Sequence, residues 1–172
     1  MAEAAARRDM WKVAIVTVIA IELLGGASGW LSQSGYGNQW FDALRKPSFM
    51  PPGYLFGIVW PILYALLGIA LALILGEPPS DRRKLGLTLF LMQMILNFAW
   101  SPLFFAAHDI TLAKLVIIAM VIIAAAAAII FYRLRPAAGL LMVPYLCWLL
   151  FATTLNASIE NLNPGAGVSF LG

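Results

Sequence analysis

The segment WFDALRKPSFMPPGYLFGIVW, residues 40–60, separates two long apolar runs and differs from both in composition. It concentrates prolines, aromatic rings and charges, whereas loops between membrane helices are usually short and bland. Proline restricts the backbone, and aromatic rings bury large contact areas. The segment therefore predicts an ordered loop that covers an aromatic pocket.

The composition on both sides of this segment indicates a membrane protein. Of the 172 residues, 62% are hydrophobic and 11% are charged, and the mean hydropathy is +0.89. A helix needs about 20 apolar residues to cross a bilayer. The runs that reach this length cover residues 11–31, 54–75, 85–107, 112–132 and 137–159. The sequence predicts an all-α integral membrane protein, a five-transmembrane-helix bundle that forms one domain over residues 1–172.

The basic residues predict the orientation of this bundle. With five spans, the N-terminus, the second loop and the fourth loop share one side of the membrane. That side carries Arg7, Arg8, Lys12, Arg82, Arg83, Lys84, Arg133 and Arg135, and the other side carries Arg45, Lys46 and Lys114. The positive-inside rule then places the N-terminus in the cytoplasm and the C-terminus outside, most simply in a bacterial inner membrane. The net charge of +3 reflects these topology signals and anionic-lipid contacts rather than nucleic-acid binding.

The loop of residues 32–53 is the one long connection, and this topology places it outside. Its FDALRK stretch before Pro47 can form a short helix.

Asp109 or Thr111 can cap the fourth span, because side-chain oxygens accept hydrogen bonds from the first helical N–H groups. The turn-rich tail of residues 161–172 is expected to be frayed.

Polar and aromatic residues recur at helical spacing in three spans. Polar side chains in a membrane face the bundle interior or a cavity, so such stripes mark the inward faces. The stripes are Gly53, Gly57, Trp60 and Tyr64 in the second span, Gln93, Asn97, Trp100 and Phe104 in the third, and Tyr145, Trp148, Ala152 and Asn156 in the fifth. The fourth span has no such stripe and is expected to face lipid. We expect the stripes to converge on one cavity beneath the long loop.

Two interpretations of the stripes stay open at this point. Aromatic residues at helical spacing are more often packing than ligand contacts, and Asn97 and Gln93 can simply hydrogen-bond between helices. Three stripes under a ring-rich loop favour instead a flat-sided apolar pocket for a large planar ligand.

Glu22 lies mid-span without a basic partner, which favours a functional role. Gly25 and Gly29 suit close helix packing, within the protomer or across a dimer.

Three prolines interrupt the spans, and each leaves the carbonyl four residues earlier without its helical donor. The prolines are Pro61, Pro102 and Pro144, and the freed carbonyls belong to Gly57, Phe98 and Leu140. Kinks beside the cavity are the expected consequence.

The sequence offers no set of residues for ordinary catalysis or metal binding. His108 is the only histidine and Cys147 the only cysteine, which is too few for a structural metal site or bis-histidine haem ligation. No Ser–His–Asp set, paired intramembrane carboxylates or phosphate loop is visible. We therefore expect no metal, no cofactor and no hydrolytic or redox chemistry.

Four motifs resemble those of the tryptophan-rich sensory protein family, the TspO/MBR family, whose members are also called translocator proteins or peripheral-type benzodiazepine receptors. They are WFDALRKPSFMPP (40–52), WPILY (60–64), LNFAW (96–100) and PYLCWLLFATTLN (144–156), in the family's order. The resemblance covers nearly the whole chain from Gly25 to Asn156. It implies a five-helix bundle, commonly a homodimer, that binds porphyrins such as protoporphyrin IX and, in some members, sterols and benzodiazepine-like ligands.

The resemblance also implies the residues that form or roof the pocket: Trp40, Pro47, Pro51, Trp60, Asn97, Trp100, Tyr145, Trp148 and Ala152. Phe49 stands where the family's loop pattern has a second tryptophan, which keeps a ring but loses an N–H donor, and Tyr64 joins the set from its stripe. The sterol motif of some animal members is missing after the fifth span, so sterol binding is not expected. If the porphyrin is degraded by light, as proposed for the family, Trp60 and Trp148 match the positions involved.

The expected function is that of a membrane receptor or sensor for tetrapyrroles and similar planar apolar ligands, with the long loop closing over the ligand. Arg45 and Lys46 either meet the propionates of a porphyrin or act only as interfacial anchors. A transporter that passes the same ligand across the membrane is the first alternative. A light-dependent porphyrin-degrading enzyme is the second.

Overall fold

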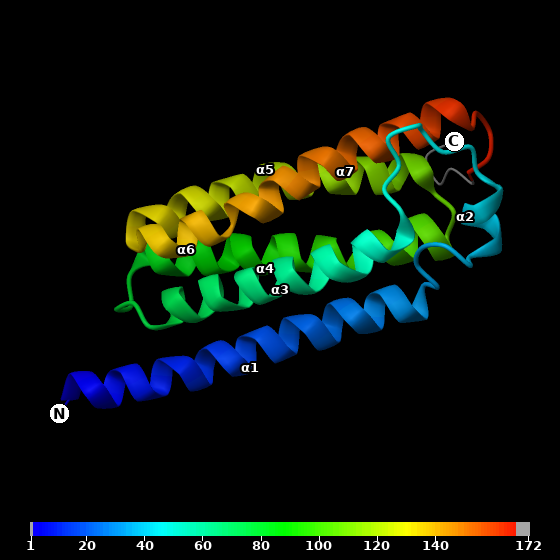
Figure 1. Ribbon diagram of the computed structural model, residues 1–172. Coiled ribbons are helices and arrows are strands. Elements are labelled where there is room, and N and C mark those ends of the chain that lie inside the picture. The colour runs from blue at the N-terminus through cyan, green and yellow to red at the C-terminus, as the bar shows by residue number, and fades with distance from the viewer. Residues whose placement is uncertain (1, 168–172) are drawn as a thin grey trace.

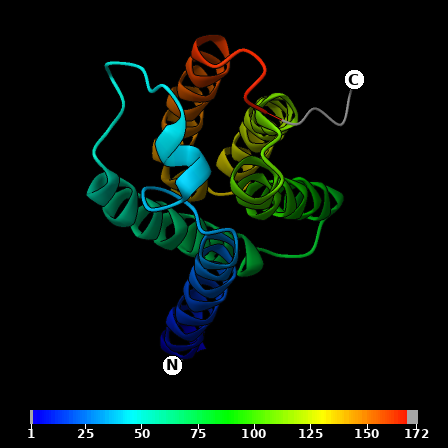
Figure 2. The same cartoon turned by 90° about the vertical axis from the view of Figure 1, so that its right-hand side faces the viewer.

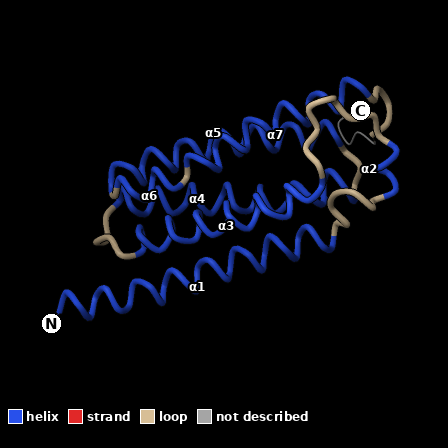
Figure 3. The backbone as a smooth tube through the Cα atoms, viewed as in Figure 1, coloured by secondary structure: helices blue, strands red, loops and turns tan. Residues whose placement is uncertain are grey.

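The computed structural model describes residues 2–167, which form helices joined by short connections. In chain order the elements are α1 (Ala2–Leu31), α2 (Gln39–Ala43), α3 (Gly53–Leu75), α4 (Asp81–Ser101), the π-helical turn η1 (Pro102–Ala106), α5 (Ile110–Leu134), α6 (Pro136–Leu141) and α7 (Val143–Leu162). Helix α4 continues into η1, and α6 and α7 together make one span (Figure 3). The predicted fold class is confirmed, because five helical segments within the described residues are long and apolar enough to cross a membrane.

The five spans lie side by side as a bundle (Figures 1 and 2). The N-terminus, the α3–α4 connection and the α5–α6 connection lie at one end, here called the α6 end. The α1–α3 connection with α2, the turn between η1 and α5, and the end of α7 lie at the opposite end, here called the α2 end. The alternation of ends is the one that the five predicted spans require.

Side-chain caps fix where two of the spans begin. Ser80 caps α4, and Asp109 caps α5 by accepting a hydrogen bond from the Leu112 N–H at 2.8 Å. Of the two residues considered for the fourth span, the cap is therefore Asp109. Thr111 instead donates its hydroxyl to Glu160 on α7 at 2.6 Å, which ties the start of α5 to the end of α7.

Helix α5 packs inside the bundle, so the expectation that the fourth span faces lipid is wrong for one of its faces. This face contacts α4, α6 and α7. Its buried residues recur at helical spacing and are apolar: Ala113, Ile117, Met120, Ala124, Ala127 and Phe131. Small side chains let neighbouring helices approach closely in a membrane. A search for polar and aromatic residues could not detect this face.

Glycine allows the closest helix contacts of the α6 half. A Cβ atom on Gly68 of α3 would lie 2.6 Å from the Val18 Cα of α1, and one on Gly139 would lie 2.7 Å from the Tyr132 Cα. The Thr17 hydroxyl donates to the Gly68 carbonyl at 2.8 Å. Helix α1 is therefore fixed directly against α3 in this half.

We expect Gly68→Ala to destabilise the bundle by about 1–3 kcal/mol, because the new methyl group would overlap backbone atoms of α1 that cannot move without shifting the helix. Gly57→Ala is the matched control on the same helix, since a Cβ atom there meets nothing within 4 Å. Thermal unfolding in detergent should show a lower midpoint for Gly68→Ala alone. Equal midpoints for the two variants would contradict this account of the α1–α3 contact.

Candidate ligand-binding pocket

A cavity of about 530 Å³ occupies the α2 half of the bundle. This volume falls in the range of about 300–1,000 Å³ found for small-molecule sites. Its walls come from α1, α3, α4, η1, α5 and α7, and its cover comes from the α1–α3 connection. The stripe residues that line it are Gly53, Gly57, Trp60, Tyr64, Asn97, Trp100, Phe104, Trp148, Ala152 and Asn156. The three stripes therefore converge on one cavity, as the sequence predicted.

Aromatic rings make up much of the wall. Trp60 of α3 meets Trp148 of α7 edge-on, with ring centroids 6.4 Å apart, and Phe56 meets Trp148 at 5.7 Å. On the opposite wall Trp100 stacks on Phe104 at 5.1 Å. The indole N–H groups of Trp100 and Trp148 are buried and donate to no described residue. These two tryptophans therefore contribute ring surface to the wall rather than hydrogen bonds.

A chain of side-chain hydrogen bonds forms the floor of the cavity. The Tyr64 hydroxyl donates to Asn97 Oδ1 at 2.8 Å, and Asn97 Nδ2 donates to the Tyr145 hydroxyl at 3.0 Å. The Tyr145 hydroxyl in turn donates to Gln93 Oε1 at 2.7 Å. Tyr145 and Gln93 are fully buried. The chain links α3, α4 and α7, and Tyr64 and Asn97 are its members that face the cavity.

The proline in α4 brings α1 to the cavity. Pro102 begins the π-helical turn η1, and the carbonyl of Phe98 loses its helical donor, as predicted. That carbonyl accepts a hydrogen bond from the Ser28 hydroxyl of α1 at 2.6 Å. An unpaired carbonyl is costly in a membrane, so this bond fixes α1 against α4 beside the cavity.

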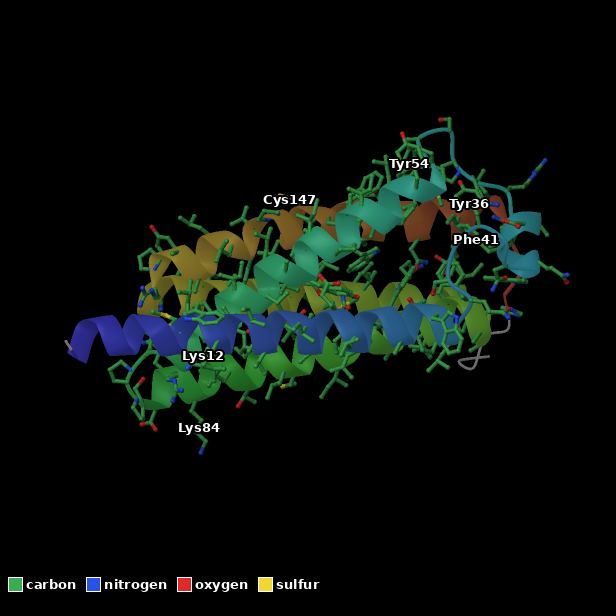
Figure 4. All side chains as sticks on the ribbon, turned by 60° about the horizontal axis from the view of Figure 1, so that its bottom comes forward. Lys12, Tyr36, Phe41, Tyr54, Lys84 and Cys147 are labelled. Atoms are coloured by element: carbon green, nitrogen blue, oxygen red, sulfur yellow. The ribbon has the colours of Figure 1, made fainter. Side chains whose placement is uncertain are left out.

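Residues 32–53, here called the roof, close the α2 end of the cavity. The predicted FDALRK helix is present as α2, although it begins at Gln39 and ends at Ala43. Asn38 caps it and also donates its amide to the Phe105 carbonyl at 3.3 Å. Phe41, labelled with Tyr36 in Figure 4, is buried against Phe105 with ring centroids 5.1 Å apart. The roof is thus an ordered, packed element.

Trp40 anchors the roof rather than lining the cavity. Its ring stacks on His108, in the turn before α5, with centroids 4.3 Å apart. Its indole N–H donates to the Ala166 carbonyl at 3.1 Å. His108 accordingly has a packing role in a connection.

The end of the chain also holds the roof. Asn163 accepts a hydrogen bond from the Arg45 N–H at 2.7 Å and donates to the Arg45 carbonyl at 2.8 Å. The described part of the tail is therefore tied down, and the expectation of a frayed tail is wrong there. Residues 168–172 lie outside the described residues.

Five of the predicted site residues do not line the cavity: Trp40, Pro47, Phe49, Pro51 and Tyr145. Trp40 anchors the roof and Tyr145 supports the floor. The carbonyls of Pro47 and Pro51 accept hydrogen bonds within the roof. Phe49 is 49% exposed, and its ring lies 6.3 Å from that of Phe151, outside the pocket.

The polar and aromatic stripes did not identify two walls of the cavity, although Glu22 had been predicted to be functional. Helix α5 contributes Ile117 and Met120, whose apolar side chains gave no signal. Helix α1 contributes Glu22 and the glycines of the GGASG stretch, Gly25, Gly26 and Gly29. These glycines were interpreted as a helix-packing motif. Gly25 does serve packing, because the Tyr64 ring occupies the space that its side chain would fill.

Charged and metal-binding groups are scarce around the cavity. Among the residues described to line it, Glu22 is the one charged side chain. Within residues 10–167, whose side chains the structure describes, no group of three His, Cys, Asp or Glu residues is arranged to hold a metal ion. Cys147 is a free, exposed thiol on α7.

A family model described as "TspO/MBR family" matches residues 15–162. "Protein CrtK" of Rhodobacter capsulatus is 35% identical to this chain, over 81% of this chain and 86% of its own. "Tryptophan-rich protein TspO" of Chlorobaculum tepidum is 39% identical, over 73% of this chain and 80% of its own. "Translocator protein" of Homo sapiens is 36% identical, over 76% of this chain and 79% of its own. The aromatic cavity thus lies in a five-span membrane protein that belongs to the TspO/MBR family.

Proposed function

We propose that this protein is a membrane receptor or sensor that binds tetrapyrroles such as protoporphyrin IX, and similar planar apolar ligands, in the cavity beneath the roof. The observation that carries the proposal is a cavity of about 530 Å³ walled by tryptophan and phenylalanine rings. Flat rings at the wall complement a flat macrocycle, and its burial supplies affinity in proportion to the apolar area removed from water. Family membership supports a sensory or translocator role.

The basic residues of the roof separate into two roles. Lys46 donates its ammonium to the carbonyls of Phe41, Asp42 and Leu44, so it already serves the roof. Arg45 is exposed, and its guanidinium makes no hydrogen bond or ion pair within residues 2–167. Of the two, Arg45 is the residue available to a propionate group. We therefore orient the porphyrin with its propionates toward the roof.

The tight packing of the α6 half favours a receptor over a transporter. Below the floor, Leu67, Ile74, Phe90 and Phe131 are almost completely buried. A transporter would have to open this half, whereas a receptor needs only the roof to move. Transport of the same ligand is therefore the alternative, and uptake of porphyrin into proteoliposomes would reveal it.

The proposal includes a homodimer in a bacterial inner membrane with the α6 end in the cytoplasm. The basic residues of that end support this orientation. Arg83 donates to the Ile74 carbonyl at 2.9 Å, and Arg135 pairs with Glu77 at 3.2 Å. Both bonds keep an arginine at the α6 end, the end that the positive-inside rule assigns to the cytoplasm.

Trp60→Phe combined with Trp148→Phe should weaken protoporphyrin IX binding by about tenfold, because both indoles lose stacking area on the ligand. Quenching of the remaining tryptophan fluorescence, measured in detergent in the dark, gives the dissociation constant. Trp148 donates no hydrogen bond to a described residue, so its replacement by phenylalanine leaves no partner unpaired.

Trp11→Phe combined with Trp30→Phe is the matched control, because it also removes two indoles, at positions 54% and 80% exposed. If both double variants bind equally well, the stripes are packing and the cavity is not the porphyrin site. Illumination followed by mass analysis of the pigment tests the enzyme alternative on the same samples. A mass change that requires Trp60 and Trp148 would add photochemistry to binding.

Asn163→Ala should loosen the roof, because it removes both hydrogen bonds to Arg45. Two such bonds contribute about 1–2 kcal/mol, so the open population should rise by about fivefold to thirtyfold. Faster dissociation of protoporphyrin IX and faster tryptic cleavage after Arg45 are the expected results, since Pro47 protects the bond after Lys46. Asn161→Ala is the control, since Asn161 is exposed and its side chain makes no hydrogen bond within the described residues. Equal rates in the two variants would show that the roof does not retain the ligand.

A further inference from the structure

The one charged side chain among the residues described to line the cavity has no partner. Glu22 lies nine residues before Leu31, the last residue of α1, and so about 14 Å from that end of the helix. It makes no hydrogen bond or ion pair with any side chain of residues 10–167. Ionisable residues inside a membrane span are costly, and they usually mark a functional site.

The neighbours of Glu22 leave its carboxyl group available to a ligand. Gly25, one turn further along α1, lets the Tyr64 ring pack directly on the helix. The Tyr64 hydroxyl could have donated to the carboxyl group, but it donates to Asn97 instead. The Tyr64 hydroxyl is therefore used within the floor of the cavity, and the Glu22 carboxyl group has no hydrogen-bond donor from it.

The electrostatic character of the cavity favours a positive charge. No Lys, Arg or His side chain is among the residues described to line it. The face of an aromatic ring carries partial negative charge and attracts cations. Trp60 and Tyr64 lie beside this part of the wall, with ring centroids 5.2 Å apart. A carboxylate next to such rings is the combination that recognises an ammonium group.

Glu22 lies where α1 and α3 separate. The two helices are held together near the α6 end by the bond from Thr17 to Gly68, and they diverge toward the α2 end (Figure 4). Gly26 of α1 and Gly57 of α3 both line the cavity, and a Cβ atom on either would meet nothing within 4 Å. This open space gives a lipophilic molecule room beside the carboxyl group.

We propose that Glu22 adapts the cavity to a second class of ligand, planar lipophilic amines in their protonated form. The positively charged N–H group pairs with the Glu22 carboxylate and lies against the rings of Trp60 and Tyr64, while the apolar body fills the cavity. The proposal rests on the proposed function in one respect, that the cavity is a ligand site. It has the opposite consequence for porphyrins, whose propionate groups are repelled from the α1 wall.

The test uses two probes with the same ring system. At pH 7.5, 9-aminoacridine is a cation and acridine is mainly neutral. Both are titrated by fluorescence against the full chain in phosphatidylcholine nanodiscs, whose lipid carries no net charge. Glu22→Gln should weaken 9-aminoacridine binding by about tenfold or more, since a hydrogen bond between charged groups is lost. Acridine binding should stay the same, and protoporphyrin IX binding should stay the same or tighten.

Two further variants keep the test decisive. Glu77→Gln removes the same charge at the α6 end, outside the cavity, and should leave the binding of all three probes unchanged. Glu22→Asp retains the charge and should keep the preference for 9-aminoacridine over acridine. Unaltered acridine binding by Glu22→Gln shows that this variant is folded. If Glu22→Gln also lost acridine, the Glu22→Asp result would decide, and a lost preference there would overturn the proposal.

The two proposals fail in different ways. If Glu22→Gln binds 9-aminoacridine as tightly as the wild type, the role of Glu22 is overturned, whatever the porphyrin result. If the Trp60→Phe and Trp148→Phe double variant weakens neither acridine nor protoporphyrin IX, the cavity itself is not the ligand site. If the tryptophan double variant weakens the binding of both acridines and Glu22→Gln weakens neither, the cavity is a ligand site but Glu22 does not select protonated amines.

Discussion

Polar side chains inside a bilayer must find partners within the protein, and the hydrogen-bond chain from Tyr64 to Gln93 is where this constraint determines the structure. Each link has a defined donor and acceptor, so α3, α4 and α7 are held at one separation and one rotation. The chain also divides the bundle. Toward the α6 end, apolar side chains fill the space completely, whereas toward the α2 end the helices surround a cavity.

The same constraint acts on the backbone and places the remaining wall. The Phe98 carbonyl, freed by Pro102, is satisfied by Ser28, and the Gly68 carbonyl accepts a second hydrogen bond from Thr17. Helix α1 is therefore fixed to α4 in the cavity half and to α3 in the other half. Between these attachments the Tyr64 ring packs against Gly25 of α1, and Glu22, one turn before Gly25, lines the cavity.

Helical periodicity predicted which residues face inward but not how deep they lie. Stripes identified Trp60, Asn97 and Trp148 correctly as cavity residues, because spacing determines the face of a helix. Gln93 and Tyr145 belong to the same stripes and lie beneath the floor, since depth depends on neighbouring helices that periodicity does not describe.

Two further features of the site are not predicted by helical spacing, for other physical reasons. Apart from Glu22, the walls from α1 and α5 carry glycine and apolar residues, which give no polar signal in a membrane sequence. Trp40 follows the loop motif, but the direction of its ring depends on His108, 68 positions away in the chain. Contacts between segments so distant in sequence are beyond local pattern analysis.

The difference in rigidity between the two halves is what a sensor requires. The roof is attached by hydrogen bonds, each contributing about 1 kcal/mol, and by the burial of Phe41 and Leu44, whereas the α6 half is held by continuous packing of whole helices. A ligand shifts a conformational equilibrium only by its differential affinity for the two states. Because the cavity is lined both by Phe41 of the roof and by Trp60 and Trp148 of the walls, a ligand touches both parts only when the roof is closed. If the cavity binds a ligand as proposed, part of the binding energy would favour the closed roof, which would change the surface at the α2 end.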